Sequence, residues 1–174
     1  MFHIKKWENI RFPEGQIYED VAIWYKILFT EDNIGLVKEV LYYYYINQAG
    51  TVRKDWTPAK LAQIKAWEDQ ISFFISNGNK NLLNYATMHL FQILQLHLYK
   101  ISKSESVSWL EKYKYESFVR QKLRKAIFRF GGTPYYKQKK LSILSSAFPQ
   151  SMWLYCAFLG KVKKFLNVLK KRKN

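Results

Sequence analysis

The sequence predicts an α+β fold that is predominantly α-helical, and three observations lead to that class. Apolar residues recur at helical spacing over residues 19–30 and again from residue 57 onward. Between them lies a run rich in branched and aromatic residues, residues 33–47, which favours one or two strands. Charge and pattern both change near residue 55. We therefore expect two domains, residues 1–55 and residues 56–174, of which the second is an all-helical bundle.

The first predicted helix begins at an acidic pair. "FPEG", residues 12–15, is typical of a turn, and a helix over residues 19–30 follows it. Its apolar positions at helical spacing are Val21, Trp24, Tyr25, Leu28 and Phe29. Acidic side chains are favoured in the first turn of a helix by the free amide groups and the helix dipole. Glu19 and Asp20 are therefore explained as helix-start residues without any chemistry.

The second predicted domain contains helices alone. Thr57 followed by Pro58 favours a helix entry, with a hydroxyl cap and a proline in the first turn. The apolar residues that continue with helical period are Leu61, Ile64, Trp67, Ile71, Phe74 and Ile75. The sequence predicts further helices over residues 81–101, 107–113 and 115–130. The first of them ends at the polar "SKSES" and the last at a glycine pair.

Charge is distributed unevenly along the chain. The formal net charge is +16, of which residues 1–55 carry −1 and residues 56–174 carry +17. From residue 117 to residue 174 there are 15 Lys and Arg and no Asp or Glu. This asymmetry favours binding to a polyanionic surface, such as anionic lipid or nucleic acid.

Cysteine, histidine and hydropathy patterns exclude several kinds of site. Cys156 is the single cysteine, which excludes an internal disulfide, and the three histidines lack the spacing of zinc ligands. No apolar run approaches the roughly 20 residues of a membrane span. The N-terminus lacks an apolar signal core. We therefore expect a cytoplasmic protein without a structural metal.

The C-terminal segment has the composition of a helix that lies in a membrane interface. Its apolar and ring-bearing positions are Trp153, Tyr155, Phe158, Leu159, Val162, Phe165 and Leu166. On the other faces, positioned for anionic headgroups, are Lys163, Lys164, Lys170 and Lys171. We expect peripheral association with the inner face of the cell membrane. The alternative is a terminal helix that packs on its own domain.

The order of features around the acidic pair is more specific than the pair itself. "IRFPEGQIYED", residues 10–20, precedes a predicted helix, and "IGLVKEVLYYYYINQAGTV", residues 34–52, follows it. This order resembles the second half of the catalytic domain of bacterial family 2 glycosyltransferases. There, a "FPEG…YED" segment is followed by a strand pair ending in tyrosines and by a Gly-Ser/Thr loop. The resemblance covers residues 10–53.

The resemblance implies an inverting transfer of a sugar from a nucleotide donor to an acceptor glycan. It also implies that residues 1–55 are the remnant of a Rossmann-like sheet of the GT-A type, acting in cell-surface polysaccharide or glycoconjugate synthesis. Asp20 would be the general base, which takes a proton as the acceptor oxygen attacks, and Glu19 would orient the site or contact the acceptor. Gly50, Thr51 and Arg53 would contact the donor diphosphate. The alternative for these three is an ordinary loop between elements.

The donor-binding half of that family is missing from the sequence. No Asp-x-Asp motif is present, and that motif holds Mg²⁺ or Mn²⁺ at the donor diphosphate. We therefore expect a fragment or the product of a split gene, with no cofactor of its own. Alone it would transfer no sugar, and a complementing N-terminal chain would have to supply the donor site and the metal.

Two other functions remain open at this stage. One is a noncatalytic helical module that docks on a membrane or on a partner protein through its basic helices. The other is a basic nucleic-acid-binding protein, given the interleaved aromatic and basic residues of residues 118–140. The second is disfavoured because the sequence shows no helix-turn-helix, zinc-finger or RNA-binding signature.

Overall fold

The fold is known from a computed structural model that describes residues 10–31, 33–35, 37–43, 45, 50 and 54–150. These residues form five α-helices, one short 3₁₀ helix and no strand. In chain order the elements are α1 (Glu19–Phe29), η2 (Pro58–Leu61), α2 (Ala62–Ser76), α3 (Lys80–Lys103), α4 (Trp109–Phe130) and α5 (Pro134–Ala147). The architecture of this part of the chain is therefore all-helical.

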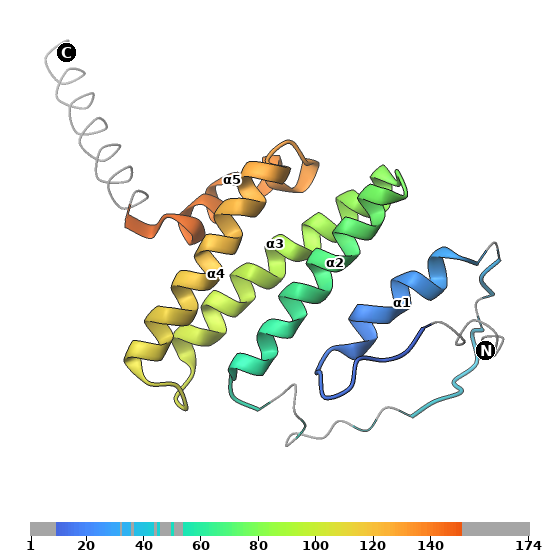
Figure 1. Cartoon of the computed structure of the whole chain (residues 1–174), viewed down its shortest axis with the longest axis horizontal. Helices are drawn as coiled ribbons and strands as arrows, with labels where there is room; N and C mark the ends of the chain where they lie inside the picture. Colours follow the sequence, from blue (N-terminus) through green and yellow to red (C-terminus); the bar gives the residue numbers. More distant parts are fainter. Residues whose placement is uncertain are drawn as a thin grey trace, which may run out of the picture.

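The helices pack in chain order around α3. Figure 1 shows α1 beside α2, α2 beside α3 and α3 beside α4, and α5 covers α3 and α4 together. α3 is the longest helix, with 24 residues. Its buried apolar residues recur every three or four positions, as one face of a helix requires: Ala86, Leu90, Phe91, Leu94, Leu98 and Ile101. The hydrophobic core is centred on this face.

Local sequence explains where the helices begin and end. The Asn79 side chain accepts the backbone N–H of Leu82 at 3.0 Å and caps the start of α3. Ser108 and Glu111 form a capping box at the start of α4, in which each side chain accepts the backbone N–H of the other. Gly78, after α2, has φ +65°, a left-handed conformation that glycine adopts without strain. The chain can therefore reverse between α2 and α3.

Rings from α1 and α2 join the first helix to the bundle. Tyr25 lies 5.2 Å from Phe73 and 5.9 Å from Phe74, measured between ring centroids. Phe29 lies 5.1 Å from Phe73 in an edge-to-face arrangement. Aromatic pairs in this geometry add to the free energy of simple burial. These four rings hold α1 against α2.

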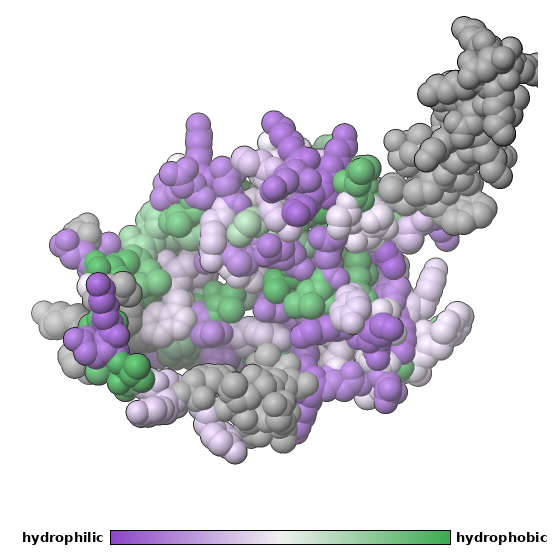
Figure 2. Space-filling view, turned by 180° about the vertical axis from the view of Figure 1, so that it is seen from behind, coloured by the Kyte–Doolittle hydropathy of each residue, from purple (hydrophilic) through white to green (hydrophobic). Residues whose placement is uncertain are grey.

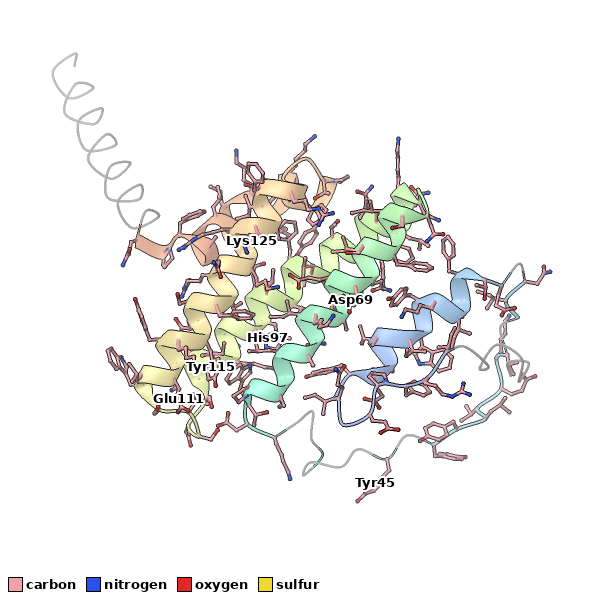
Figure 3. The ribbon with its side chains drawn as sticks, viewed as in Figure 1. Tyr45, Asp69, His97, Glu111, Tyr115 and Lys125 are labelled. Atoms are coloured by element: carbon pink, nitrogen blue, oxygen red, sulfur yellow. The ribbon has the colours of Figure 1, made fainter. Side chains whose placement is uncertain are left out.

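The predicted α+β class is wrong for the described residues. None of residues 33–35, 37–43 and 45 lies in a strand, so the expected Rossmann-like GT-A remnant is not found there. Tyr43 and Tyr45 are 89% and 87% exposed, and Tyr45 points away from the helices in Figure 3. β propensity measures how well a side chain fits a half-buried pleated surface. The described part of the chain offers no neighbouring strand to complete such a surface.

The predicted helices of residues 19–30 and 57–130 are confirmed, with two differences. The helix expected from Thr57 begins as the 3₁₀ helix η2, and the Thr57 hydroxyl makes no capping hydrogen bond. α1 begins at Glu19, as expected, and ends at Phe29. Residues 107–113 and 115–130 were expected to form two helices, but both belong to α4. The intervening Lys114 is a good helix former and gives the chain no reason to break. The proposed division into two domains stays a prediction.

Candidate functional site

The two carboxylates expected to perform chemistry lie in the first turn of α1. Glu19 and Asp20 are both exposed, and Asp20 Oδ1 accepts the backbone N–H of Val21 at 2.8 Å. The N-cap residue, Tyr18, makes no side-chain capping hydrogen bond. The acidic pair therefore supplies the negative charge that favours this helix start. The general-base role of Asp20 is not tested by this geometry.

The remaining expected site residues fall mostly outside the described part of the chain. Gly50 is half-buried, and its carbonyl accepts the backbone N–H of Lys54 at 3.1 Å. Thr51 and Arg53 lie outside the described residues. So does the whole set expected to contact a membrane, from Trp153 to Lys171. These assignments stay predictions.

Asp55 ties the segment before η2 to the connection between α3 and α4. Its Oδ2 accepts the hydroxyl of Ser104 at 2.7 Å and the backbone N–H groups of Glu105 and Ser106 at 3.1 and 2.8 Å. Hydrogen bonds from Ser106 and Ser104 hold the pKa of Asp55 well below its usual range. Because these donors belong to the connection between α3 and α4, Asp55 has a structural role. It holds the segment before η2 against that connection.

Next to Asp55, a buried hydrogen bond joins Trp56 to α3. The Trp56 indole N–H donates to His97 Nδ1 at 3.0 Å, and the two side chains are 2% and 3% exposed. Burial, aided by the charges of Lys100 and Lys60, lowers the pKa of His97 to about 4. Tyr115 of α4 packs on Trp56, with ring centroids 5.1 Å apart, and lies near His97 in Figure 3. His97 is therefore a neutral core residue.

An aromatic pocket lies between α1, α2 and the start of α3, with a cavity volume of about 450 Å³. The rings that line it belong to Trp24, Tyr25, Phe29, Trp67, Phe74 and Tyr85. Asp20 is the one charged residue among the lining residues. Two buried polar atoms of the lining, Trp67 Nε1 and Gln70 Oε1, have no hydrogen-bond partner in the described structure. Both atoms are closed to solvent, so the wall that the pocket presents is mainly apolar.

The side of α4 that faces away from α3 is both apolar and basic. Phe128 is 96% exposed near the C-terminal end of the helix, and Trp109, Leu110 and Tyr113 are 79%, 69% and 68% exposed at its start. The residues that we call the outer face of α4 are Trp109, Leu110, Tyr113, Lys114, Lys125 and Phe128. Leu110 and Phe128 lie opposite the buried positions of the helix, and Trp109 lies on the flank of this face.

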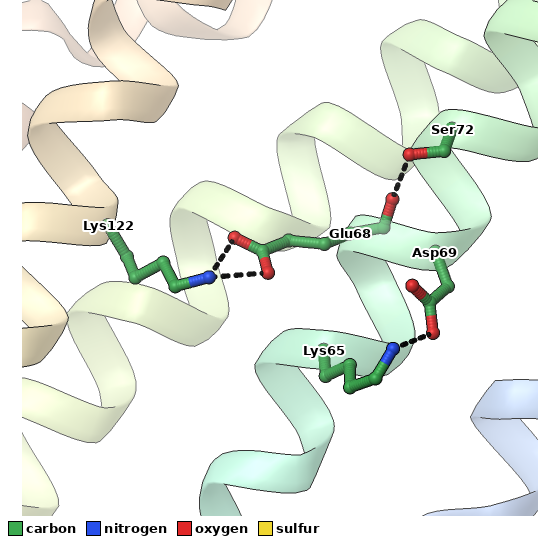
Figure 4. A network of polar contacts seen from close by, with 5 residues as sticks. All are labelled: Lys65, Glu68, Asp69, Ser72 and Lys122. Carbon is green, nitrogen blue, oxygen red and sulfur yellow. Dashed lines mark hydrogen bonds and ion pairs between the residues drawn. The ribbon is translucent and has the colours of Figure 1, made fainter.

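Basic residues alone carry charge around the C-terminal half of this face. Residues 117–150 contain eight Lys and Arg and no Asp or Glu. Lys122 is paired with Glu68 of α2 at 2.7 Å, beside the Lys65–Asp69 pair of α2 (Figure 4). The basic residues of this region that are exposed are Arg124, Lys125, Arg129, Lys137, Lys139 and Lys140. Figure 2 shows hydrophilic side chains projecting along the edge that α5 and the α4–α5 turn form.

Comparison with known proteins gives no family for this chain. No protein-family model, no curated protein and no solved structure matches it. Together with the absence of strands from the described residues, this result overturns the resemblance to family 2 glycosyltransferases. The segment that carried the resemblance, residues 10–53, contains a turn, an acidic helix start and, among its described residues, no strand. Helix dipoles favour an acidic start in any fold, so the part that remains is a weak family marker.

Two further findings limit the chemistry of the described residues. None of their helices combines the length and apolarity that crossing a bilayer requires. No three His, Cys, Asp or Glu side chains among them are grouped so that they suit a metal ion.

Sequence reasoning missed the outer face of α4, although the sequence contains a signal for it. Val119, Leu123 and Ala126 form the buried stripe of the helix. Phe128 lies outside that stripe, on the same side of the helix as Lys125, which comes three positions earlier. A group of aromatic residues outside the apolar stripe, together with basic residues, is typical of a contact surface.

Proposed function

We propose that this protein is a noncatalytic helical module that docks on an anionic membrane surface through the outer face of α4. The observation that carries the proposal is the 96% exposed side chain of Phe128 beside the exposed Lys125 and Arg129. Apolar rings next to basic side chains are typical of interfacial membrane contacts. The ring enters the boundary of the acyl chains while the charge meets the anionic headgroups.

The ends of α4 support the same contact. Trp109 and Tyr113 stack near the start of the helix, with ring centroids 6.5 Å apart. Trp and Tyr favour the headgroup level because they join an apolar ring to a polar tip. Phe128 lies on the last turns of the 22-residue helix, roughly 28 Å along the helix from Trp109. Anchors at both ends place α4 parallel to the membrane plane.

Two contributions to the binding free energy are expected to combine. Burial of one Phe side chain contributes about 1.5–3 kcal/mol. Each Lys or Arg near an anionic bilayer contributes about 1 kcal/mol, and salt reduces this part. Binding should therefore be reversible and should weaken both when the ring is removed and when ionic strength rises.

Sedimentation with vesicles tests the proposal. We expect the protein to sediment with phosphatidylcholine vesicles that contain about 30% phosphatidylserine, a typical anionic composition. Phe128→Ala and Lys125→Glu should each weaken this binding about tenfold, in line with the free energies of ring burial and charge contact. Tyr99→Ala is the matched control, because Tyr99 is an exposed ring on α3, 62% exposed. It should leave binding unchanged.

Three outcomes would contradict the docking proposal. One is equal binding to vesicles of pure phosphatidylcholine. Another is unchanged binding by both Phe128→Ala and Lys125→Glu. The third is salt-dependent binding to random DNA in a gel shift without any binding to anionic vesicles, which would favour a nucleic-acid partner instead.

Sugar transfer stays a prediction that no observation tests, and the docking proposal does not depend on it. We expect this chain alone to transfer no sugar and to bind sugar nucleotides weakly at most, because it lacks an Asp-x-Asp motif for the metal at the donor diphosphate. Titration calorimetry with UDP-glucose and Mn²⁺ checks this expectation. Micromolar affinity would show it to be wrong.

A further inference from the structure

The charge of the aromatic pocket differs from that of the whole chain. The chain has a formal net charge of +16, yet no Lys or Arg is among the residues that line the pocket. Asp20 is its one charged lining residue and is exposed, so the carboxylate lies at the mouth. An anion entering the pocket would meet this negative charge. The pocket therefore favours a neutral or cationic ligand.

The rings of the wall strengthen the preference for a cation. Trp24 and Tyr85, which are 36% and 52% exposed, are among the six aromatic lining residues. The face of an aromatic ring carries partial negative charge and attracts ammonium groups, with Trp the strongest of the three ring types. A carboxylate and several rings around one cavity together form a site for an organic ammonium group.

Packing holds the inner wall in place. The Trp67 ring stacks on His89, with centroids 4.7 Å apart and an interplanar angle of 10°. Trp67 Nε1 and Gln70 Oε1 are buried and closed to solvent, so the wall offers a ligand mainly apolar contact.

Nearby His89 does not oppose a cation. It lies behind Trp67 and beside Tyr85, whose ring centroid is 4.4 Å away. Burial lowers the pKa of His89, so at neutral pH the imidazole is uncharged. A cationic ligand in the pocket is therefore not repelled by His89.

We propose that the aromatic pocket binds a small organic cation with a flat apolar body. Its ammonium group lies beside Asp20 and the rings at the mouth. Its flat body packs against the apolar wall. This ligand matches the negative mouth and the apolar wall together.

A pair of isosteric ligands tests the proposal on the whole chain. (4-Hydroxyphenyl)trimethylammonium carries the charge, and 4-tert-butylphenol has the same shape without it. We expect titration calorimetry to show about tenfold tighter binding of the cation, the magnitude of a partly desolvated cation–π and carboxylate contact. Asp20→Asn should abolish this difference.

Glu116→Gln is the matched control for the charge. Glu116 is a carboxylate on α4 that pairs with Arg120 at 3.2 Å and does not line the pocket. It should leave the preference for the cation unchanged. Equal affinity for the two ligands, an unchanged preference in Asp20→Asn, or the absence of saturable binding would each overturn the proposal. Circular dichroism of each variant confirms that the helices are retained.

Discussion

Replacement of Phe91 by alanine is expected to lower the free energy of unfolding by about 3–5 kcal/mol. Phe91 is 0% exposed, and its ring centroid lies 5.8 Å from Tyr136 and 6.5 Å from Tyr135 of α5. Truncation removes buried apolar surface and also leaves a cavity between α3 and α5. Both effects lower the free energy of unfolding. Urea unfolding followed by circular dichroism measures the change.

The same substitution at Phe128 is the matched control. Because Phe128 is 96% exposed, Phe128→Ala should change the free energy of unfolding by no more than about 0.5 kcal/mol. Similar losses at both positions would contradict the packing of α5 on α3. A loss of cooperative unfolding in Phe91→Ala alone agrees with the prediction, because small domains have only about 5–15 kcal/mol of stability.

Acidification from pH 7 to pH 4 is expected to destabilise the protein by about 3 kcal/mol through His97. The ordinary pKa of 6.5 applies to the unfolded chain, and burial lowers the pKa to about 4 in the folded state. Between these values the unfolded state binds more protons than the folded state. The stability from neutral His97 is therefore complete above pH 6.5 and is lost as the pH falls toward 4. Urea unfolding at a series of pH values measures this loss of stability.

His97→Asn separates this effect from other titrations. An asparagine amide oxygen near the position of Nδ1 keeps an acceptor for the Trp56 indole N–H, and it does not titrate. The slope between pH 6.5 and pH 4 should become smaller, with a remainder from His89, whose pKa burial also lowers. Asp55 has a lowered pKa, so its stabilisation is lost only as the pH falls below the usual carboxyl range. An unchanged slope in His97→Asn would contradict the role of His97.

Local patterns predicted the helices well because their causes are local. Helix starts depend on caps and acidic first turns within a few residues, as at Ser108 and Glu19. The run of residues 33–47 is the counter-example. Its composition favours strands, but a strand needs a partner elsewhere in the chain, and the described residues provide none.

The candidate sites depend on contacts between distant residues, which no local pattern contains. Asp20 lines the same pocket as Trp67 and Tyr85, about 50 and 65 positions later in the chain, only because α1 packs on α2. His97 has a lowered pKa because Trp56, 41 positions away, covers it. Phe128 is exposed because α5 packs on a different side of α4.

The sequence by itself determined the helices, their starts and the one-signed charge of residues 117–150, since these follow from spacing, capping chemistry and composition. It also suggested a catalytic carboxylate, a family and a pair of strands that neither the comparisons nor the described fold support. Only the tertiary structure decided which side chains are covered. Burial is a property of the packed helices together, because each face is hidden or exposed by whichever element lies against it.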